Sequence, residues 1–102
     1  MSTPQEIVEN AIAEHKVVVF SKSWCPYCKA TKALFAEHFH DETPFIVELD
    51  ERKDGEDIQQ YLLTKTGQSS VPNIFINKEH VGGNDKAQAK YKNGELKRLV
   101  NL

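Results

Sequence analysis

The stretch Val17-Val18-Val19-Phe20-Ser21-Lys22-Ser23-Trp24-Cys25-Pro26-Tyr27-Cys28 decides the fold. Its first four residues form a continuous β-branched and aromatic run, which is typical of a strand buried on both faces in a sheet flanked by helices. Its last four residues hold the only two cysteines of the chain, at a spacing that one helical turn spans. A chain whose whole cysteine complement lies at such a point is suited to thiol–disulfide exchange.

The composition indicates one small domain, and we expect residues 1–102 to form it. Hydrophobic residues make up 39% and charged residues 27%, so a core can form without disulfide or metal staples. A net charge of −2 favours neither nucleic acid nor an anionic membrane as a partner. We also expect no membrane span and no N-terminal signal peptide, which favours a reducing cytosolic or nuclear setting, with the cytoplasm preferred. We expect the protein to be a monomer.

Hydrophobic periodicity and turn residues predict alternating helices and strands. The strands are expected at residues 17–20, 45–49, 73–76 and 79–81, the last two joined by a tight turn at Asn77 and Lys78. The helices are expected from a Thr3 cap to about residue 15, at 27–40, at 56–66, and after a cap at Asn84 or Asp85, with a short helical turn near Leu99. This order predicts an α/β fold, with a small mixed sheet and helices on both of its faces.

The two cysteines are expected to differ in reactivity. Pro26 fits the first position of a helix, which puts Cys25 at the N-cap. A thiolate there meets free N–H groups and the positive end of the helix dipole, and Lys22 and Lys29 add positive charge, so the pKa of Cys25 should fall below the ~8.5 of a free thiol. Cys28 lies one turn inside the helix and is shielded. The prediction is that Cys25 attacks and Cys28 resolves.

Two other uses of a Cys-x-x-Cys pair fit the sequence less well. A structural zinc site needs about four ligands, whereas the chain has no second cysteine pair and its four histidines are scattered. A permanent structural disulfide does not suit a reducing compartment. Redox exchange is the preferred interpretation, and we expect no metal.

Three segments together resemble a known family. Lys22-x-x-Cys25-Pro26-Tyr27-Cys28, then Ser70-Val71-Pro72, then Gly82-Gly83-Asn84-Asp85 are similar, in order and spacing, to the signature segments of dithiol glutaredoxins. The resemblance implies a thioredoxin fold, a four-stranded mixed sheet with an added N-terminal helix. It also implies glutathione as cosubstrate, and disulfide-bonded or glutathionylated proteins as the partners that are reduced.

The resemblance further implies which residues surround the reactive sulfur. Pro72 resembles the family's cis-proline, which turns the backbone of Val71 toward an extended substrate so that the two pair like strands. Gly83 lets the chain turn sharply into a helix, and Asn84 and Asp85 are expected to hold the γ-glutamyl end of glutathione.

Other positions extend the same resemblance. Lys22 and Gln59 correspond to residues that hold the glycyl carboxylate of glutathione, and Tyr27 to the aromatic residue that flanks its sulfur. Trp24 and Ser70 depart from the usual family pattern. These two departures keep the chemistry and bear on substrate preference.

Two alternative functions remain open at this stage. One is a thioredoxin served by a reductase, although thioredoxins more often carry Gly-Pro between the cysteines. The other is a glutaredoxin that holds an iron–sulfur cluster between two subunits, although such proteins typically have a small residue where this chain has Pro26.

Overall fold

The computed structural model describes residues 2–102, and Met1, the first residue of the expected domain, lies outside the described part. The strands are β1 (Val17–Ser21), β2 (Phe45–Glu48), β3 (Asn73–Ile76) and β4 (Glu79–Gly82). The helices are α1 (Pro4–Glu14), α2 (Pro26–His38), the short 3₁₀ helix η1 (Leu49–Glu51), α3 (Gly55–Thr66), α4 (Asn84–Lys92) and α5 (Glu95–Val100).

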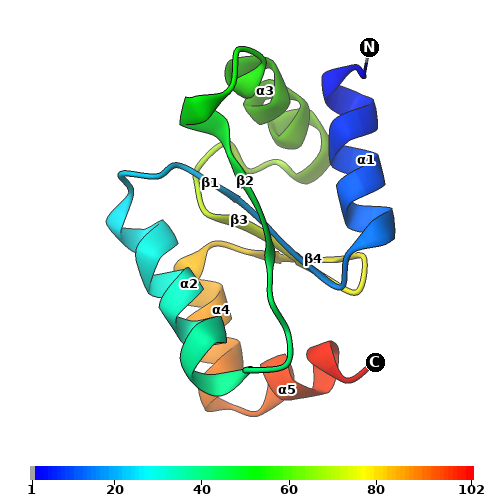
Figure 1. Cartoon of the computed structure of the whole chain (residues 1–102). Coiled ribbons are helices and arrows are strands. Elements are labelled where there is room, and N and C mark those ends of the chain that lie inside the picture. The colour runs from blue at the N-terminus through cyan, green and yellow to red at the C-terminus, as the bar shows by residue number, and fades with distance from the viewer. Residues whose placement is uncertain (1) are drawn as a thin grey trace.

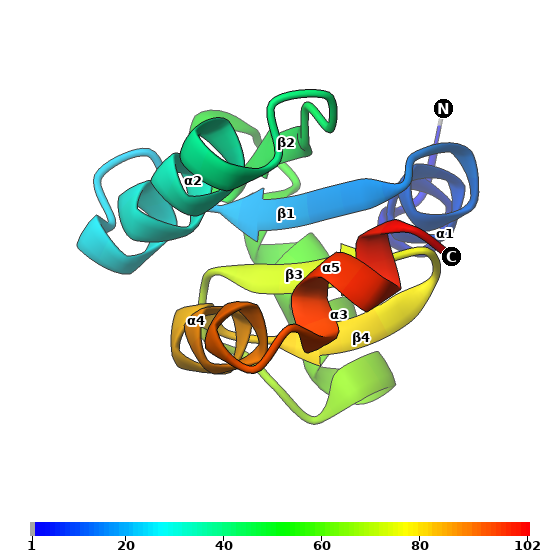
Figure 2. The ribbon, with the colours of Figure 1, turned by 90° about the horizontal axis from the view of Figure 1, so that it is seen from below.

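The strands form one mixed sheet in the order β2-β1-β3-β4. β1 runs parallel to β2 and antiparallel to β3, and Figure 2 shows β1, β3 and β4 side by side. Asn77 and Lys78 turn the chain between β3 and β4 with φ values of 47° and 71°. The predicted hairpin and mixed sheet are therefore confirmed.

Helices cover both faces of the sheet, as the sequence predicts (Figure 1). Val18 and Phe20 of β1 face a core cluster that they share with α1 and α3. Val17 and Val19 face the opposite cluster, which includes side chains of α2, α4 and α5. Because successive side chains of a strand point to opposite faces, β1 is buried on both sides and forms the centre of the molecule.

Local signals place most helix ends correctly. Thr3 and Glu6 form both hydrogen bonds of a capping box at the start of α1. The prediction of Asn84 or Asp85 as the cap of α4 is wrong, because Gly83 is the N-cap and no side chain caps this helix. Helix η1 was not predicted. Gly55 lets α3 begin against it, since a Cβ at Gly55 would lie only 1.8 Å from the Leu49 carbonyl oxygen.

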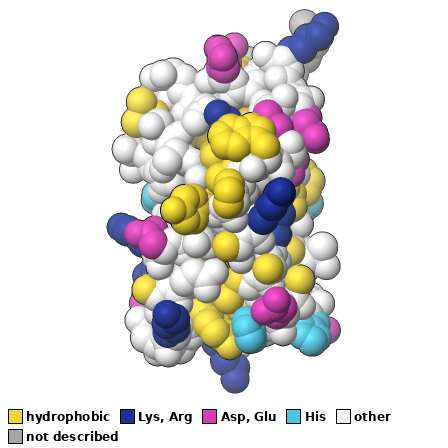
Figure 3. All heavy atoms as spheres, turned by 90° about the vertical axis from the view of Figure 1, so that its left-hand side faces the viewer, with side chains coloured by type: hydrophobic (Ala, Val, Ile, Leu, Met, Phe, Trp, Pro, Cys, Tyr) yellow, Lys and Arg dark blue, Asp and Glu magenta, His cyan; other side chains and the backbone are white. Residues whose placement is uncertain are grey.

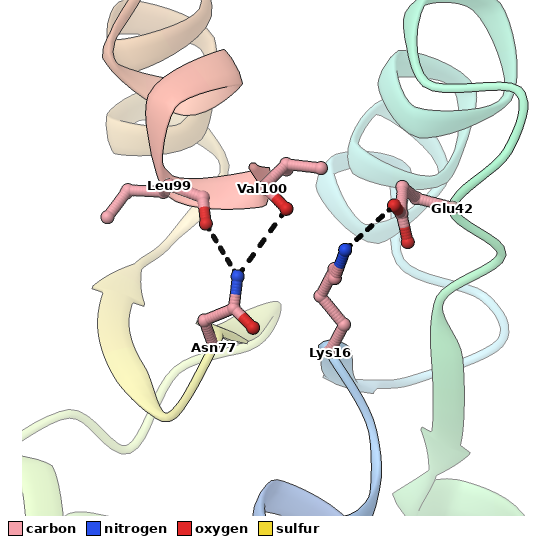
Figure 4. A network of polar contacts seen from close by, with 5 residues as sticks. All are labelled: Lys16, Glu42, Asn77, Leu99 and Val100. Carbon is pink, nitrogen blue, oxygen red and sulfur yellow. Dashed lines mark hydrogen bonds and ion pairs between the residues drawn. The ribbon is translucent and has the colours of Figure 1, made fainter. Parts of the chain in front are cut away.

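Long-range polar contacts tie the chain together at the end of β1 remote from the cysteines (Figure 4). Asn77 Nδ2 donates to the carbonyl oxygens of Leu99 at 2.7 Å and Val100 at 3.5 Å, which holds α5 against the β3–β4 turn. Lys16 forms an ion pair of 3.1 Å with Glu42. Among residues 2–102, no helix combines the length and apolar character needed to cross a membrane.

Candidate active site at the start of α2

The connection from β1 to α2 places the two buried cysteines at the start of α2, just beyond the end of β1. Cys25 is the N-cap of α2, and Pro26 occupies the first turn, as predicted. The backbone N–H of Ser23 donates to Asp50 Oδ1 at 3.0 Å, and the Ser23 hydroxyl donates to the other carboxylate oxygen of Asp50. These bonds join the loop between β1 and α2 to η1 and so anchor the residues that precede Cys25.

Cys25 has the environment of a nucleophile. Its Sγ accepts no hydrogen bond of capping geometry, contrary to the expectation, and the thiol instead donates weakly to the Val71 carbonyl oxygen at 3.9 Å. Burial raises the pKa of Cys25, but the backbone and thiol of Cys28, the backbone N–H of Tyr27 and the charge of Lys22 all favour the thiolate and together outweigh burial. The pKa of Cys25 therefore lies below its ordinary value, and the thiolate is favoured.

Cys28 is the opposite case. Its side chain is fully buried, and burial raises the pKa of its thiol above the ordinary value, although the Lys22 backbone and the Ser21 side chain favour the thiolate. The charge of a Cys25 thiolate raises the pKa further. Both thiols are free in this structure. The two cysteines thus have opposite pKa shifts one helical turn apart.

The Val71–Pro72 segment lies against Cys25. The peptide bond between these two residues is cis, as the resemblance implied. Gln68 Nε2 donates to the carbonyl oxygens of Ser70 and Pro72, each at 3.0 Å, so the Gln68 side chain holds the backbone on both sides of Val71 in place.

The beginning of α4 lies beside the same segment. A Cβ at Gly83 would lie 3.8 Å from the Pro72 carbonyl oxygen, which shows how closely the two backbones approach. Asn84 Oδ1 accepts from Thr31 Oγ1 at 2.9 Å and from Gln88 Nε2 at 3.2 Å, so its side chain joins α4 to α2. Asp85 is exposed. The structure therefore brings the Cys25, Pro72 and Gly83 segments together.

Lys22 and Gln59 line a second part of the site. They share a hollow of about 340 Å³ with Trp24 and with two further cations, Arg52 and Lys53. The ammonium of Lys22 lies 5.9 Å from the centre of the Trp24 ring, in a cation–π arrangement. Gln59 Nε2 donates to the Ser69 carbonyl oxygen. The carboxylates of Asp50 and Glu56 also line this hollow, so it holds charges of both signs next to the loop that leads to Cys25.

Two aromatic side chains flank the cysteines on the outside. Trp24 is 63% exposed and Tyr27 is 66% exposed, which is unusual for such large apolar groups. Figure 3 views the side of the molecule on which the β1–α2 connection lies, and hydrophobic side chains gather in the middle of this face. The surface around the reactive sulfur is therefore partly apolar.

Sequence reasoning missed the residues that hold the site in place. Thr31 is a fully buried polar residue in the helix that carries the cysteines, and Asp50 lies in η1, two residues after the end of β2. The positions of these two residues in the sequence could have marked them as important, but they do not indicate which residue each one bonds to. Within residues 2–102 no group of three or more His, Cys, Asp or Glu side chains is arranged to hold a metal ion.

A strand followed by Cys-x-x-Cys at a helix start, with a cis-proline beside the first cysteine, defines a thiol–disulfide oxidoreductase of the thioredoxin fold. The glutaredoxin family model matches residues 17–81. The chain belongs to the glutaredoxin family, and its activity is that of a glutathione-dependent disulfide oxidoreductase.

Individual relatives agree with this assignment over nearly the whole chain. Glutaredoxin-C4 of Arabidopsis thaliana is 46% identical over 102 residues, covering 99% of this chain and 74% of the relative. Glutaredoxin-1 of Rhizophagus irregularis is 47% identical over 100 residues, covering 98% and 97%. The crystal structure of a buckwheat glutaredoxin–glutathione complex superposes with a TM-score of 0.90 at 36% identity, covering 96% of this chain and 87% of that one.

Proposed function

We propose that this glutaredoxin reduces protein disulfides and protein–glutathione mixed disulfides, with Cys25 as nucleophile. The observation that carries the proposal is the position of Cys25 at the N-cap of α2, with its sulfur against the Val71 carbonyl oxygen; the lowered pKa of Cys25 agrees with it. The Cys25 thiolate attacks one sulfur of the substrate disulfide, the old S–S bond breaks, and the leaving sulfur takes a proton from solvent.

The second half of the reaction releases Cys25. When the adduct is a mixed disulfide with glutathione, the thiolate of a second glutathione attacks the bound glutathione sulfur and forms glutathione disulfide. When the adduct is a protein, Cys28 attacks the Cys25 sulfur and closes the internal disulfide, which two glutathione molecules then reduce. We propose that the chain works as a monomer in a glutathione-rich compartment such as the cytoplasm. Family membership does not favour a thioredoxin or a cluster carrier.

We further propose a binding mode for glutathione around Cys25. Lys22 and Gln59 would hold the glycyl carboxylate, because a cation and an amide line one hollow there. The Val71 backbone would pair with the cysteinyl residue as an added strand, ahead of Pro72. Tyr27 would cover the sulfur from the exposed side.

The γ-glutamyl end would lie at the start of α4. The first N–H groups of a helix have no partner within it and attract a carboxylate, and Gly83 and Asn84 supply them. The amide oxygen of the Asn84 side chain already accepts two hydrogen bonds, so Asn84 would contact glutathione through its backbone N–H. The exposed carboxylate of Asp85 would pair with the ammonium group.

Single cysteine variants test the assignment of roles. Glutathione-dependent reduction of a small glutathione mixed disulfide should disappear in Cys25→Ser, because no nucleophile remains. It should survive in Cys28→Ser, because a second glutathione can release the adduct. Reduction of a protein disulfide should decline in Cys28→Ser. Activity retained in Cys25→Ser would refute the proposed function.

A further inference from the structure

Two buried polar atoms without partners lie side by side in the sheet. Among residues 2–102, Ser21 Oγ and Glu48 Oε1 are the buried side-chain oxygens or nitrogens that have no hydrogen-bond partner. Ser21 and Glu48 are paired in register on the parallel strands β1 and β2, so their side chains project to the same face. Buried polar groups without partners are rare in folded proteins, and each one requires a physical explanation.

Both side chains face helix α2 and its buried cysteine. Val19, two residues before Ser21 on β1, packs into the core cluster that contains side chains of α2, so Ser21 points the same way. Glu48 forms an ion pair of 2.8 Å with Lys32 of α2. Lys32 follows Cys28 by four residues and therefore lies on the same side of the helix. Ser21 and Glu48 thus face the side of α2 that carries Cys28 and Lys32.

The two unpaired atoms match the two needs of Cys28 when it ionises. The Ser21 hydroxyl can donate to a thiolate, and the Glu48 carboxylate oxygen can accept a proton. A thiol is a weak hydrogen-bond acceptor, whereas a thiolate is a strong one. Ser21 is fully buried, as Cys28 is, so its hydroxyl has no water to bond with while Cys28 is protonated. Formation of the Cys28 thiolate gives the hydroxyl an acceptor. An interaction made only in the reacting state accelerates that step.

We propose that Ser21 and Glu48 serve Cys28 in the resolving step, with the Ser21 hydroxyl stabilising the Cys28 thiolate and the Glu48 carboxylate accepting the released proton. This proposal rests on the proposed role of Cys28 as the resolving cysteine. The Cys28 S–H bond breaks and its proton passes to Glu48. The Cys28 sulfur then bonds to the Cys25 sulfur, and the bond from Cys25 to the substrate sulfur breaks, with its electron pair leaving on the substrate thiolate.

A single-turnover reaction separates this step from the first attack. Reduced protein is mixed with glutathione disulfide and quenched with acid, and mass spectrometry distinguishes the protein–glutathione adduct from the internal disulfide. Ser21→Ala and Glu48→Gln should each slow conversion of the adduct to the internal disulfide about tenfold, the value of one hydrogen bond to a charged group. Adduct formation at Cys25 should keep its rate. Unchanged conversion in both variants would overturn the proposal.

Matched variants distinguish this role from a structural one. Lys32→Gln breaks the same ion pair but keeps the carboxylate, so closure should stay fast; closure as slow as in Glu48→Gln would refute proton acceptance by Glu48. Ser21→Thr keeps the hydroxyl, so it should form the internal disulfide at about the wild-type rate, unlike Ser21→Ala. In a Cys28→Ser background, Ser21→Ala should leave mixed-disulfide reduction unchanged, and a loss there would indicate a folding effect instead. Failure of the wild type to form any adduct would contradict the proposed function itself.

Discussion

At the scale of single residues, the reactivity of Cys25 depends on charges and dipoles placed within a few ångströms. Burial raises the pKa of its thiol, hydrogen bonding from Cys28 and Tyr27 lowers it, and the charge of Lys22 lowers it further. Lys22→Met should therefore raise the pKa of Cys25 and slow its alkylation at neutral pH severalfold. The measurement is the iodoacetamide alkylation rate against pH, in a Cys28→Ser background so that only one thiol reacts.

The sign of this pH dependence follows from the direction of the shift. Alkylation requires the thiolate, so its rate falls as the pH drops through the lowered pKa of Cys25. The thiolate stabilises the folded state above the unfolded pKa, and this contribution is lost as the pH falls through the folded pKa. Lys97→Met, at an exposed position on α5, is the control and should leave the curve in place. An identical curve for Lys22→Met would show that Cys25 does not sense this charge.

At the scale of secondary-structure elements, the contact between α2 and α4 aligns the reactive cysteine with the proposed γ-glutamyl site. Thr31 is fully buried, and its hydroxyl bonds to Asn84 at the first turn of α4. Thr31→Val removes this bond, worth about 0.5–1.5 kcal/mol, and should raise the KM for glutathione severalfold with little change in the alkylation pKa of Cys25. Steady-state kinetics with varied glutathione measure the effect.

Two further variants serve as controls for Thr31→Val. Thr31→Ser keeps the hydroxyl and should restore the KM. Thr64→Val removes an exposed hydroxyl that donates to the Gln60 carbonyl oxygen at 3.2 Å within α3, so it makes the same chemical change at a position with no bond to the site. An equal rise in KM for Thr64→Val would mean that general loosening, rather than the α2–α4 contact, governs glutathione binding.

At the scale of the whole molecule, one sheet separates two core clusters, and both depend on β1. Ile58→Ala on the α3 side and Leu96→Ala on the α5 side remove fully buried groups and should each cost about 2–5 kcal/mol of unfolding free energy. Because β1 contributes to both clusters, urea unfolding followed by far-UV circular dichroism and by fluorescence of Trp24 should give one shared midpoint in each variant. Separate midpoints would indicate that the two faces unfold independently.

Much of this architecture was predictable because its signals are local. The hydrophobic run at 17–20 identifies the central strand, Thr3 and Glu6 identify the start of α1, and Asn77-Lys78 identifies the hairpin turn. Each of these patterns acts within a few residues of the chain. The cap of α4 was mispredicted for the opposite reason: the Asn84 side chain that would form a local cap bonds instead to Thr31, a residue distant in sequence.

The sequence by itself determined the reactive pair, the order of helices and strands, and the family, because a Cys-x-x-Cys after a buried strand and before a helix has few physical uses. Only the tertiary structure decided which groups support those cysteines. The bonds between Ser23 and Asp50, the pairing of Ser21 with Glu48 and the ion pair of Glu48 with Lys32 join residues from different elements. Such contacts depend on strand register and helix packing, and these are set by the collapse of the whole core rather than by any one segment.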